Sequence, residues 1–229
     1  MVKILERASF WLIAPYAAWM ALMMCLPSAP WAYSVRTAAT LALLALAAVR
    51  RGKDSAAPAV EEADSAVRRG KDSAAPAVEG SDSTGDADSC PLRILCGVVI
   101  GLLVLVIWIA PDRLPWYREF CVIGDPYAHA KALPLDSAFT WIQLFGSACV
   151  ISVAEELFFR KWLIRYAGFG WMVALFAIEH NRPAVAAICG VLYGLLYLKK
   201  GLFAAIVAHA TTNLLLGLFV LRFNRWEFW

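Results

Sequence analysis

Charged residues are scarce in this chain: Asp, Glu, Lys and Arg make up 17% of its 229 residues, whereas hydrophobic residues make up 61%. Soluble globular domains carry about 25% charged residues, so this composition excludes an ordinary soluble fold. The apolar runs are also continuous, without the alternation that a transmembrane β-barrel requires. We therefore predict an all-α fold, a polytopic transmembrane helical bundle whose first partner is the lipid bilayer.

The chain also lacks the signatures of several site classes. Its net charge is only +3 and it has no basic patch interleaved with aromatic residues, so we expect no nucleic-acid partner. Its six cysteines are scattered and no pair has CxxC spacing. This pattern indicates neither a disulfide framework nor a zinc site built on thiolates.

Hydrophobicity predicts about seven membrane spans, two of them short. They cover residues 9–27, 31–49, 92–110, 138–159, 168–181, 184–198 and 201–221. The first follows Lys3 and Arg7 as a signal peptide would, but it is long for one and a second run follows at once, so we expect it to be retained. A cytoplasmic N-terminus places most of the 21 Lys and Arg residues on the cytoplasmic side, which predicts this orientation in the plasma membrane.

These spans divide the chain into four parts, of which the second is polar. The parts are an N-terminal transmembrane helix pair at 1–49, a loop at 50–91, a third transmembrane helix with an outer loop at 92–137, and a core at 138–229. In the loop, the sequence of residues 48–61 recurs without change at 66–79, a tandem repeat of 18 residues. Its Ala, Ser, Asp, Gly and Pro residues bury too little apolar surface to fold, so we predict a disordered cytoplasmic loop.

The core contains an acidic pair, Glu155 and Glu156, inside an apolar run. Ionisable residues in membrane segments are costly and therefore indicate a functional site. Arg160 follows Glu156 by four residues, the spacing at which side chains meet on a helix, so we expect these two to pair. Adjacent helical residues point in different directions. We therefore expect Glu155 to remain free as a candidate general base, and the two glutamates not to face one cavity together.

Two further polar pairs follow, each with a spacing of four residues. Phe176 and His180 place an aromatic ring and an imidazole on one helix face, and Glu179 beside them is able to orient or replace the histidine. His209 and Asn213 form one polar stripe on the last apolar helix. Such a stripe is either an interhelical hydrogen bond or a pair of donors for a developing oxyanion.

The ordered motifs EExxxR, FxxxH and HxxxN resemble those of the CPBP family over residues 138–221. This family comprises the CAAX-processing and bacteriocin-processing intramembrane proteases, including the Ras-converting-enzyme and lysostaphin-resistance types. The resemblance implies that an intramembrane CAAX-type endopeptidase cleaves a membrane-associated peptide or protein. It implies that Glu155 activates a water with His180 and that His209 and Asn213 stabilise the oxyanion. Glu156, Arg160 and Phe176 are expected to support the site.

Other chemistries remain open for the same residues. The chain has no HExxH motif and a water activated by glutamate needs no metal, so we expect no cofactor. The alternative is a zinc-dependent membrane hydrolase in which Glu155, His180 and His209 hold the ion and leave one position open. A non-catalytic membrane scaffold that binds a partner in the same polar cavity is a further alternative.

The span at 168–181 is short for a membrane crossing. Its 14 residues extend about 21 Å as a helix, against a hydrocarbon core of about 30 Å. It is therefore either a tilted crossing in a thinned membrane or half of a re-entrant pair that turns at mid-depth at residues 181–183. With Glu155 about 7 Å from the end of its span near Arg160, we expect the site to open toward the cytoplasm.

Overall fold

The computed structural model describes residues 2–27, 29–56, 89–123, 134 and 137–228. These residues fold into helices joined by short connections, and no strand occurs among them, as the all-α prediction requires. The polar loop that was predicted to be disordered falls largely on residues 57–88, outside the described part of the chain.

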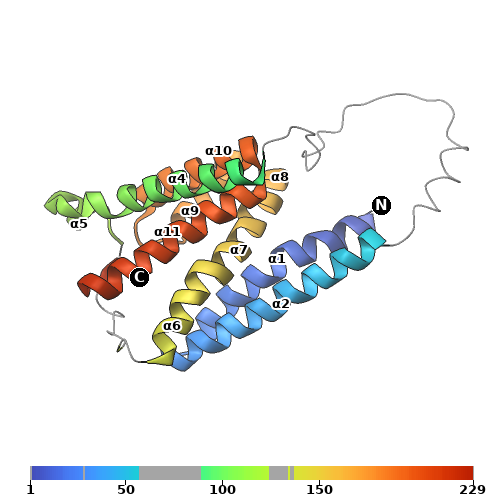
Figure 1. Cartoon of the computed structure of the whole chain (residues 1–229), viewed down its shortest axis with the longest axis horizontal. Coiled ribbons are helices and arrows are strands. Elements are labelled where there is room, and N and C mark those ends of the chain that lie inside the picture. The colour runs from blue at the N-terminus through green and yellow to red at the C-terminus, as the bar shows by residue number, and fades with distance from the viewer. Residues whose placement is uncertain (1, 28, 57–88, 124–133, 135–136, 229) are drawn as a thin grey trace, which may run out of the picture.

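Two antiparallel helices, α1 (Val2–Cys25) and α2 (Pro30–Ala56), form a pair along one side of the molecule (Figure 1). Pro30 begins α2, where its fixed φ suits the first helical turn. The helix then continues to Ala56, beyond its predicted end at residue 49.

A second group of helices lies on the other side and consists of four elements (Figure 1). They are α4 (Cys90–Ile109), α9 (Phe169–Ile178), α10 (Pro183–Lys200) and α11 (Leu202–Phe223). Short helical turns, η1 (Ala110–Arg113) and α5 (Pro115–Phe120), follow α4, and η4 (Trp226–Phe228) follows α11.

One long helix separates these two groups and contacts both. It is continuous through five segments, α6 (Ala138–Phe145), η2 (Gly146–Ile151), α7 (Ser152–Glu155), η3 (Glu156–Leu163) and α8 (Ile164–Ala167). Segments η2 and η3 are π-helical, with wider turns closed by i→i+5 hydrogen bonds. The α-helical turn α7 therefore stands between two π-helical stretches.

The length of this helix corrects the predicted depth of the acidic pair. The span was expected to end at residue 159, but the helix runs on to Ala167. Glu155 therefore lies about 18 Å from that end at 1.5 Å per residue, near the middle of the helix. The predicted distance of about 7 Å was wrong because Arg160, which was taken to mark the interface, is completely buried.

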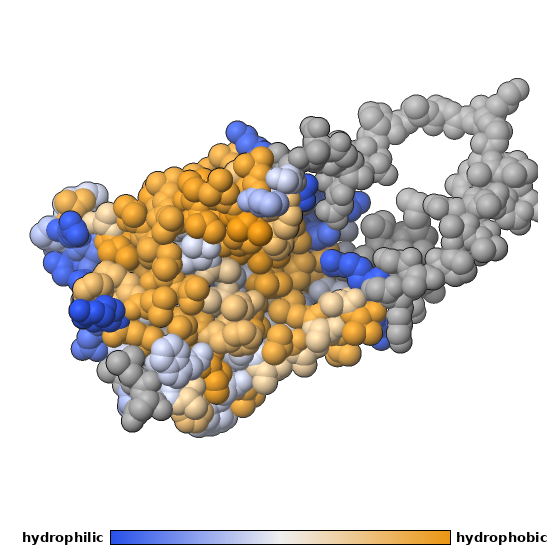
Figure 2. All heavy atoms as spheres, viewed as in Figure 1, coloured by the Kyte–Doolittle hydropathy of each residue, from blue (hydrophilic) through white to orange (hydrophobic). Residues whose placement is uncertain are grey.

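In the part of the chain that the structure describes, five helices are long and apolar enough to cross a membrane: Pro30–Arg51, Cys90–Arg113, Ala138–Ala167, Pro183–Lys200 and Leu202–Phe223. The other two predicted spans correspond to the shorter apolar helices Ser9–Cys25 and Phe169–Ile178, so seven full spans are not confirmed. Figure 2 shows a broad hydrophobic band between hydrophilic residues at the two ends, the surface expected of a bilayer-spanning bundle.

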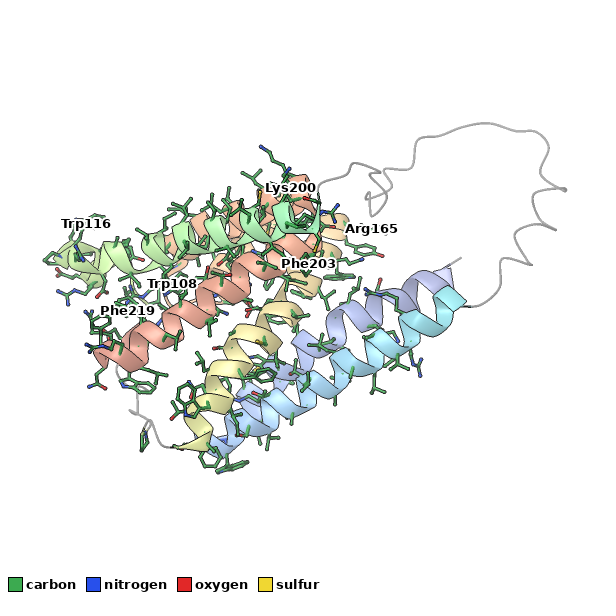
Figure 3. The ribbon with its side chains drawn as sticks, viewed as in Figure 1. Trp108, Trp116, Arg165, Lys200, Phe203 and Phe219 are labelled. Carbon is green, nitrogen blue, oxygen red and sulfur yellow. The ribbon has the colours of Figure 1, made fainter. Side chains whose placement is uncertain are left out.

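The turn between α9 and α10 lies at one end of the bundle. Asn181 O accepts a hydrogen bond from Ile123 N at 2.7 Å, and Arg182 Nη2 is 3.0 Å from Asp112 Oδ1. The two partners, Ile123 and Asp112, follow the last residue of α4 in the chain. This end of the bundle lies opposite the end at which Lys200 is found (Figure 3). The turn therefore does not stop at the middle of the bundle, which argues against the re-entrant alternative.

Close contact between α4 and α11 depends on glycine. A Cβ atom on Gly101 would lie 2.6 Å from Ala208 O, a backbone atom of α11. Thr212 of α11 bonds across the same contact, with Oγ1 2.9 Å from Gly101 O. Because His209 lies between Ala208 and Thr212, this contact also sets the height of the imidazole.

We predict that Gly101→Ala destabilises the protein, because the added methyl group must push α11 away. Overpacking of this kind costs about 1–3 kcal/mol. Gly170→Ala is the matched control, since a Cβ there meets nothing within 4 Å and the change favours helix by up to about 1 kcal/mol. Thermal unfolding in detergent measures both, and equal melting temperatures for wild type and Gly101→Ala would contradict the prediction.

Candidate active site

The acidic pair lies at the junction of α7 and η3, with the two carboxylates in different surroundings. Glu156 is fully buried, and its Oε1 lies 3.1 Å from Arg160 Nη1, which confirms the pairing expected from the spacing. The same Oε1 lies 2.8 Å from His209 Nδ1. Glu155 Oε2 is also buried but has no hydrogen-bond partner among the described residues.

Both glutamates lie beside one imidazole, a meeting that the helix spacing alone did not predict. Glu156 contacts His209 at Nδ1, and Glu155 Oε2 lies 3.8 Å from His209 Nε2. The ring of His209 therefore lies between the two carboxylates, and its two nitrogens face one each. With Nδ1–H donated to Glu156, Nε2 is left to face Glu155 and the site.

Arg160 is enclosed by aromatic rings. Its Cζ atom lies 4.4 Å from the ring centre of Phe176, 5.4 Å from that of Tyr193 and 5.7 Å from that of Phe159. Cation–π attraction to these rings, together with Glu156, compensates a guanidinium that has no exposed surface. Phe176 thus supports the site through the arginine, and Tyr193 stacks on His209 with 5.0 Å between ring centres.

His180 follows the last turn of α9. Its Nδ1 lies 2.7 Å from Phe176 O, the geometry of an Nδ1–H donor to a carbonyl. This bond assigns the neutral tautomer in which Nε2 carries the lone pair. The ring lies between Phe176, at 4.6 Å, and Trp108 of α4, at 5.6 Å between centres.

The side chain of Asn213 is already hydrogen-bonded to the long helix. Its Nδ2 donates to Ser147 O and to Ser152 Oγ, both at 3.0 Å. Ser152 in turn donates to Ser147 O at 3.0 Å. In this arrangement both amide N–H groups of Asn213 are used, so an oxyanion would have to replace one of these acceptors.

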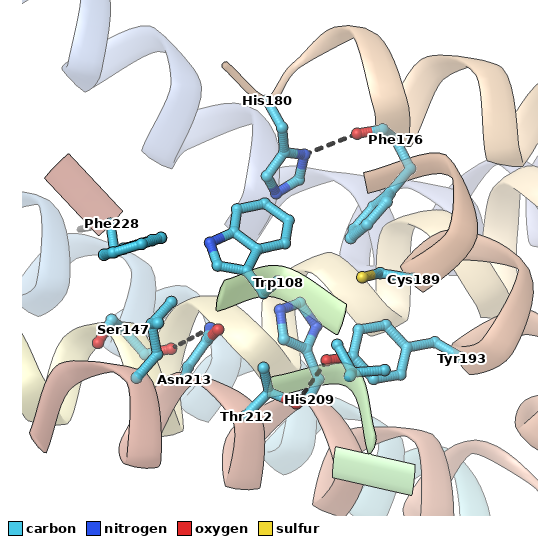
Figure 4. A pocket seen from close by; sticks show the side chains of 12 residues that line it. Trp108, Ser147, Phe176, His180, Cys189, Tyr193, His209, Thr212, Asn213 and Phe228 are labelled. Carbon is cyan, nitrogen blue, oxygen red and sulfur yellow. Dashed lines mark hydrogen bonds between the residues drawn. The ribbon is translucent and has the colours of Figure 1, made fainter. Parts of the chain in front are cut away.

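A cavity of about 170 Å³ joins these elements and is lined by His180, His209 and Asn213, with Ser147, Phe176 and Tyr193 (Figure 4). The other lining residues are Thr212 and five apolar side chains, those of Val104, Trp108, Cys189, Leu216 and Phe228. The cavity extends from His209 toward Phe228, at the end of the bundle where α11 finishes. This end of the bundle lies opposite Lys200. The site had been expected to open toward the cytoplasmic side, where the N-terminus was placed, but the cavity lining leads away from that end.

One group of metal-ligating side chains occurs in the described ranges. Ligand atoms of Glu155, Glu179 and His180 all lie within 4.8 Å of one another. The sequence had suggested Glu155, His180 and His209 for zinc, so Glu179 stands where His209 was expected. Two carboxylates and one imidazole would leave coordination positions open for water.

Several residues around the site had not been singled out from sequence. Trp108, Ser147 and Tyr193 line the cavity, and Ser152 bonds Asn213. The signal for the serines was their position one or two turns before Glu155 on a predicted helix. Trp108 and Tyr193 gave no such signal, because aromatic residues are common in apolar helices.

We predict that Arg160→Ala destabilises the protein by about 3–5 kcal/mol, because Glu156 would keep a buried charge without its cation. Arg165→Ala, on the exposed last turn of the same helix, serves as control and should change the stability by less than about 0.5 kcal/mol. Unfolding of both variants in the same detergent compares them. Equal stability of the two variants would show that the buried pair is not needed for folding.

One segment of the chain matches a known protein family. Residues 137–215 match the family model described as type II CAAX prenyl endopeptidase, Rce1-like. No curated protein and no solved structure matches the chain. The matched segment contains all three motifs, from Glu155 to Asn213. The long apolar helices show that the chain is an integral membrane protein. Residues 137–215 therefore match the Rce1-like CAAX-type proteases of the CPBP family.

Proposed function

We propose that this protein is an intramembrane endopeptidase that hydrolyses a peptide bond of a membrane-associated protein or peptide. The observation that carries the proposal is the convergence of Glu155 with His180 and His209, the two histidines that line the cavity, within the segment that matches a protease family. These residues come from three different helices, so sequence proximity does not account for their meeting.

In the proposed reaction, Glu155 accepts a proton from a water as its oxygen attacks the scissile carbonyl carbon. His180 holds the same water, because its Nε2 lone pair accepts the second O–H. The carbonyl oxygen becomes an oxyanion, which His209 stabilises through a protonated Nε2 while Glu156 balances the charge at Nδ1. Glu155 then gives the proton to the leaving nitrogen, and the products are a carboxylic acid and an amine.

Asn213 is proposed as the second oxyanion donor. Its amide lines the cavity, and a substrate oxygen would take the place of Ser147 O or Ser152 Oγ as acceptor. The exchange replaces one hydrogen bond by a bond to a charged oxygen, which is the stronger kind. The donor thus becomes available only when the oxyanion forms.

The proposal includes the plasma membrane as location and a cytoplasmic N-terminus. The cavity then faces away from the cytoplasmic end, because its lining leads toward Phe228. A substrate segment that enters from the outer half of the membrane fits this geometry. Metal-free chemistry is proposed, since a carboxylate and an imidazole suffice to activate the water.

The test is a cleavage assay in liposomes with a library of membrane-proximal peptides, with and without prenyl groups. We predict that Glu155→Gln lowers kcat at least about 100-fold, because the general base is lost, while the protein stays folded. His209→Ala should also abolish cleavage. Glu119→Gln, which removes an exposed carboxylate on α5, is the control and should leave kcat unchanged.

Metal analysis on the same samples separates the alternatives. Cleavage without stoichiometric metal, lost in Glu155→Gln, supports the proposed chemistry. Activity that disappears with a chelator and returns with zinc would replace it with a zinc-dependent hydrolase. Absence of cleavage for every peptide, with a partner protein retained equally by wild type and Glu155→Gln, would indicate a scaffold.

A further inference from the structure

Glu179 is a buried carboxylate that the proposed reaction does not use. It caps the end of α9, directly before His180, and its side chain is 14% exposed. Its Oε1 atom is buried and has no hydrogen-bond partner among the described residues. A buried acceptor without a partner is costly and is rare in folded proteins, so this oxygen requires an explanation.

The unpartnered oxygen faces the imidazole that is proposed to hold the water. Glu179 Oε1 lies 3.7 Å from His180 Nδ1, the nitrogen that also contacts Phe176 O at 2.7 Å. The carbonyl fixes the tautomer, and the carboxylate of Glu179, when ionised, adds a negative charge on the same side of the ring. When Nε2 of His180 binds a proton, the positive charge on the ring is therefore balanced by Glu179 on the Nδ1 side.

The other oxygen of Glu179 is held from α1. The hydroxyl group of Tyr16 donates a short hydrogen bond to Glu179 Oε2. Tyr16 is itself 7% exposed and fixed by the long helix, stacked on Phe158 at 4.7 Å and edge-on to Phe159 at 5.4 Å. The orientation of Glu179 is thus determined by a helix outside residues 137–215, the segment that matches the protease family.

We propose that Glu179 is a positioning residue of the active site, which orients His180 and balances its charge while Tyr16 holds the carboxylate in place. The proposal rests on the proposed peptidase function. It extends the site from three helices to four, because α1 contributes Tyr16. A base that is oriented by a third group is a recurrent arrangement in hydrolytic sites.

The same liposome assay tests this inference with three variants: Glu179→Gln, Tyr16→Phe and the double variant. Glu179→Gln keeps the size of the side chain and an oxygen that accepts from Tyr16, but removes the charge. We expect it to lower kcat about tenfold or more and to leave KM within about twofold, because substrate contacts are unchanged. Tyr16→Phe should have a smaller effect of the same kind, and the double variant should be no slower than Glu179→Gln alone.

Matched controls separate positioning from general loss of structure. Glu119→Gln removes a carboxylate on α5, and Tyr117→Phe removes the hydroxyl group of a tyrosine with 4% exposure. Both should retain wild-type kcat. Melting temperatures for all variants show whether a loss of kcat occurs without unfolding, which a purely structural role does not explain.

Four outcomes would overturn the inference. Wild-type kcat in Glu179→Gln, in a preparation in which Glu155→Gln is inactive, would leave the peptidase function intact and remove the role of Glu179. Multiplicative effects of Tyr16→Phe and Glu179→Gln would show that the two side chains act separately. Loss of a stoichiometric metal from Glu179→Gln would make Glu179 a metal ligand instead. A fully inactive wild type would reject the peptidase function itself, and this inference with it.

Discussion

The buried pair of Glu156 and Arg160 is the constraint on which the rest of the site depends. Two charges at this depth cannot be solvated by water, so protein groups must compensate them where they lie. His209 of α11 donates a hydrogen bond to the carboxylate of Glu156. Phe176 of α9 and Tyr193 of α10 pack against the guanidinium group of Arg160. The long helix is thereby fixed to three neighbours at one level. The cavity lies beside this junction and keeps its polar groups in a defined arrangement.

Much of this could be predicted from local spacing. Continuous apolar runs predicted helices, and a separation of four residues predicted that Glu156 meets Arg160 and that Phe176 lies beside His180. His209 and Asn213 line one cavity for the same reason. These inferences succeeded because they concern residues on one helix, where geometry is fixed by the backbone alone.

Other features arise from contacts between helices, which no spacing reveals. The long helix was expected to end before Arg160, since a charge normally marks the interface, but aromatic rings and Glu156 allow it to be buried. The two glutamates meet His209 of α11 at its two ring nitrogens, a contact between helices. Asn213 bonds Ser147 and Ser152 across the α11 contact.

The π-helical stretches on both sides of α7 have a consequence for the evolution of this segment. The i→i+5 hydrogen bond of a π turn encloses one more residue than the i→i+4 bond of an α turn. The shape of each stretch therefore depends on its number of residues. Loss of a single residue between Glu156 and Arg160 would favour an ordinary α turn and would change the spacing of this ion pair. Such a segment accepts exchanges of side chains far more readily than any change in its length. Among related sequences, gaps should therefore fall outside it.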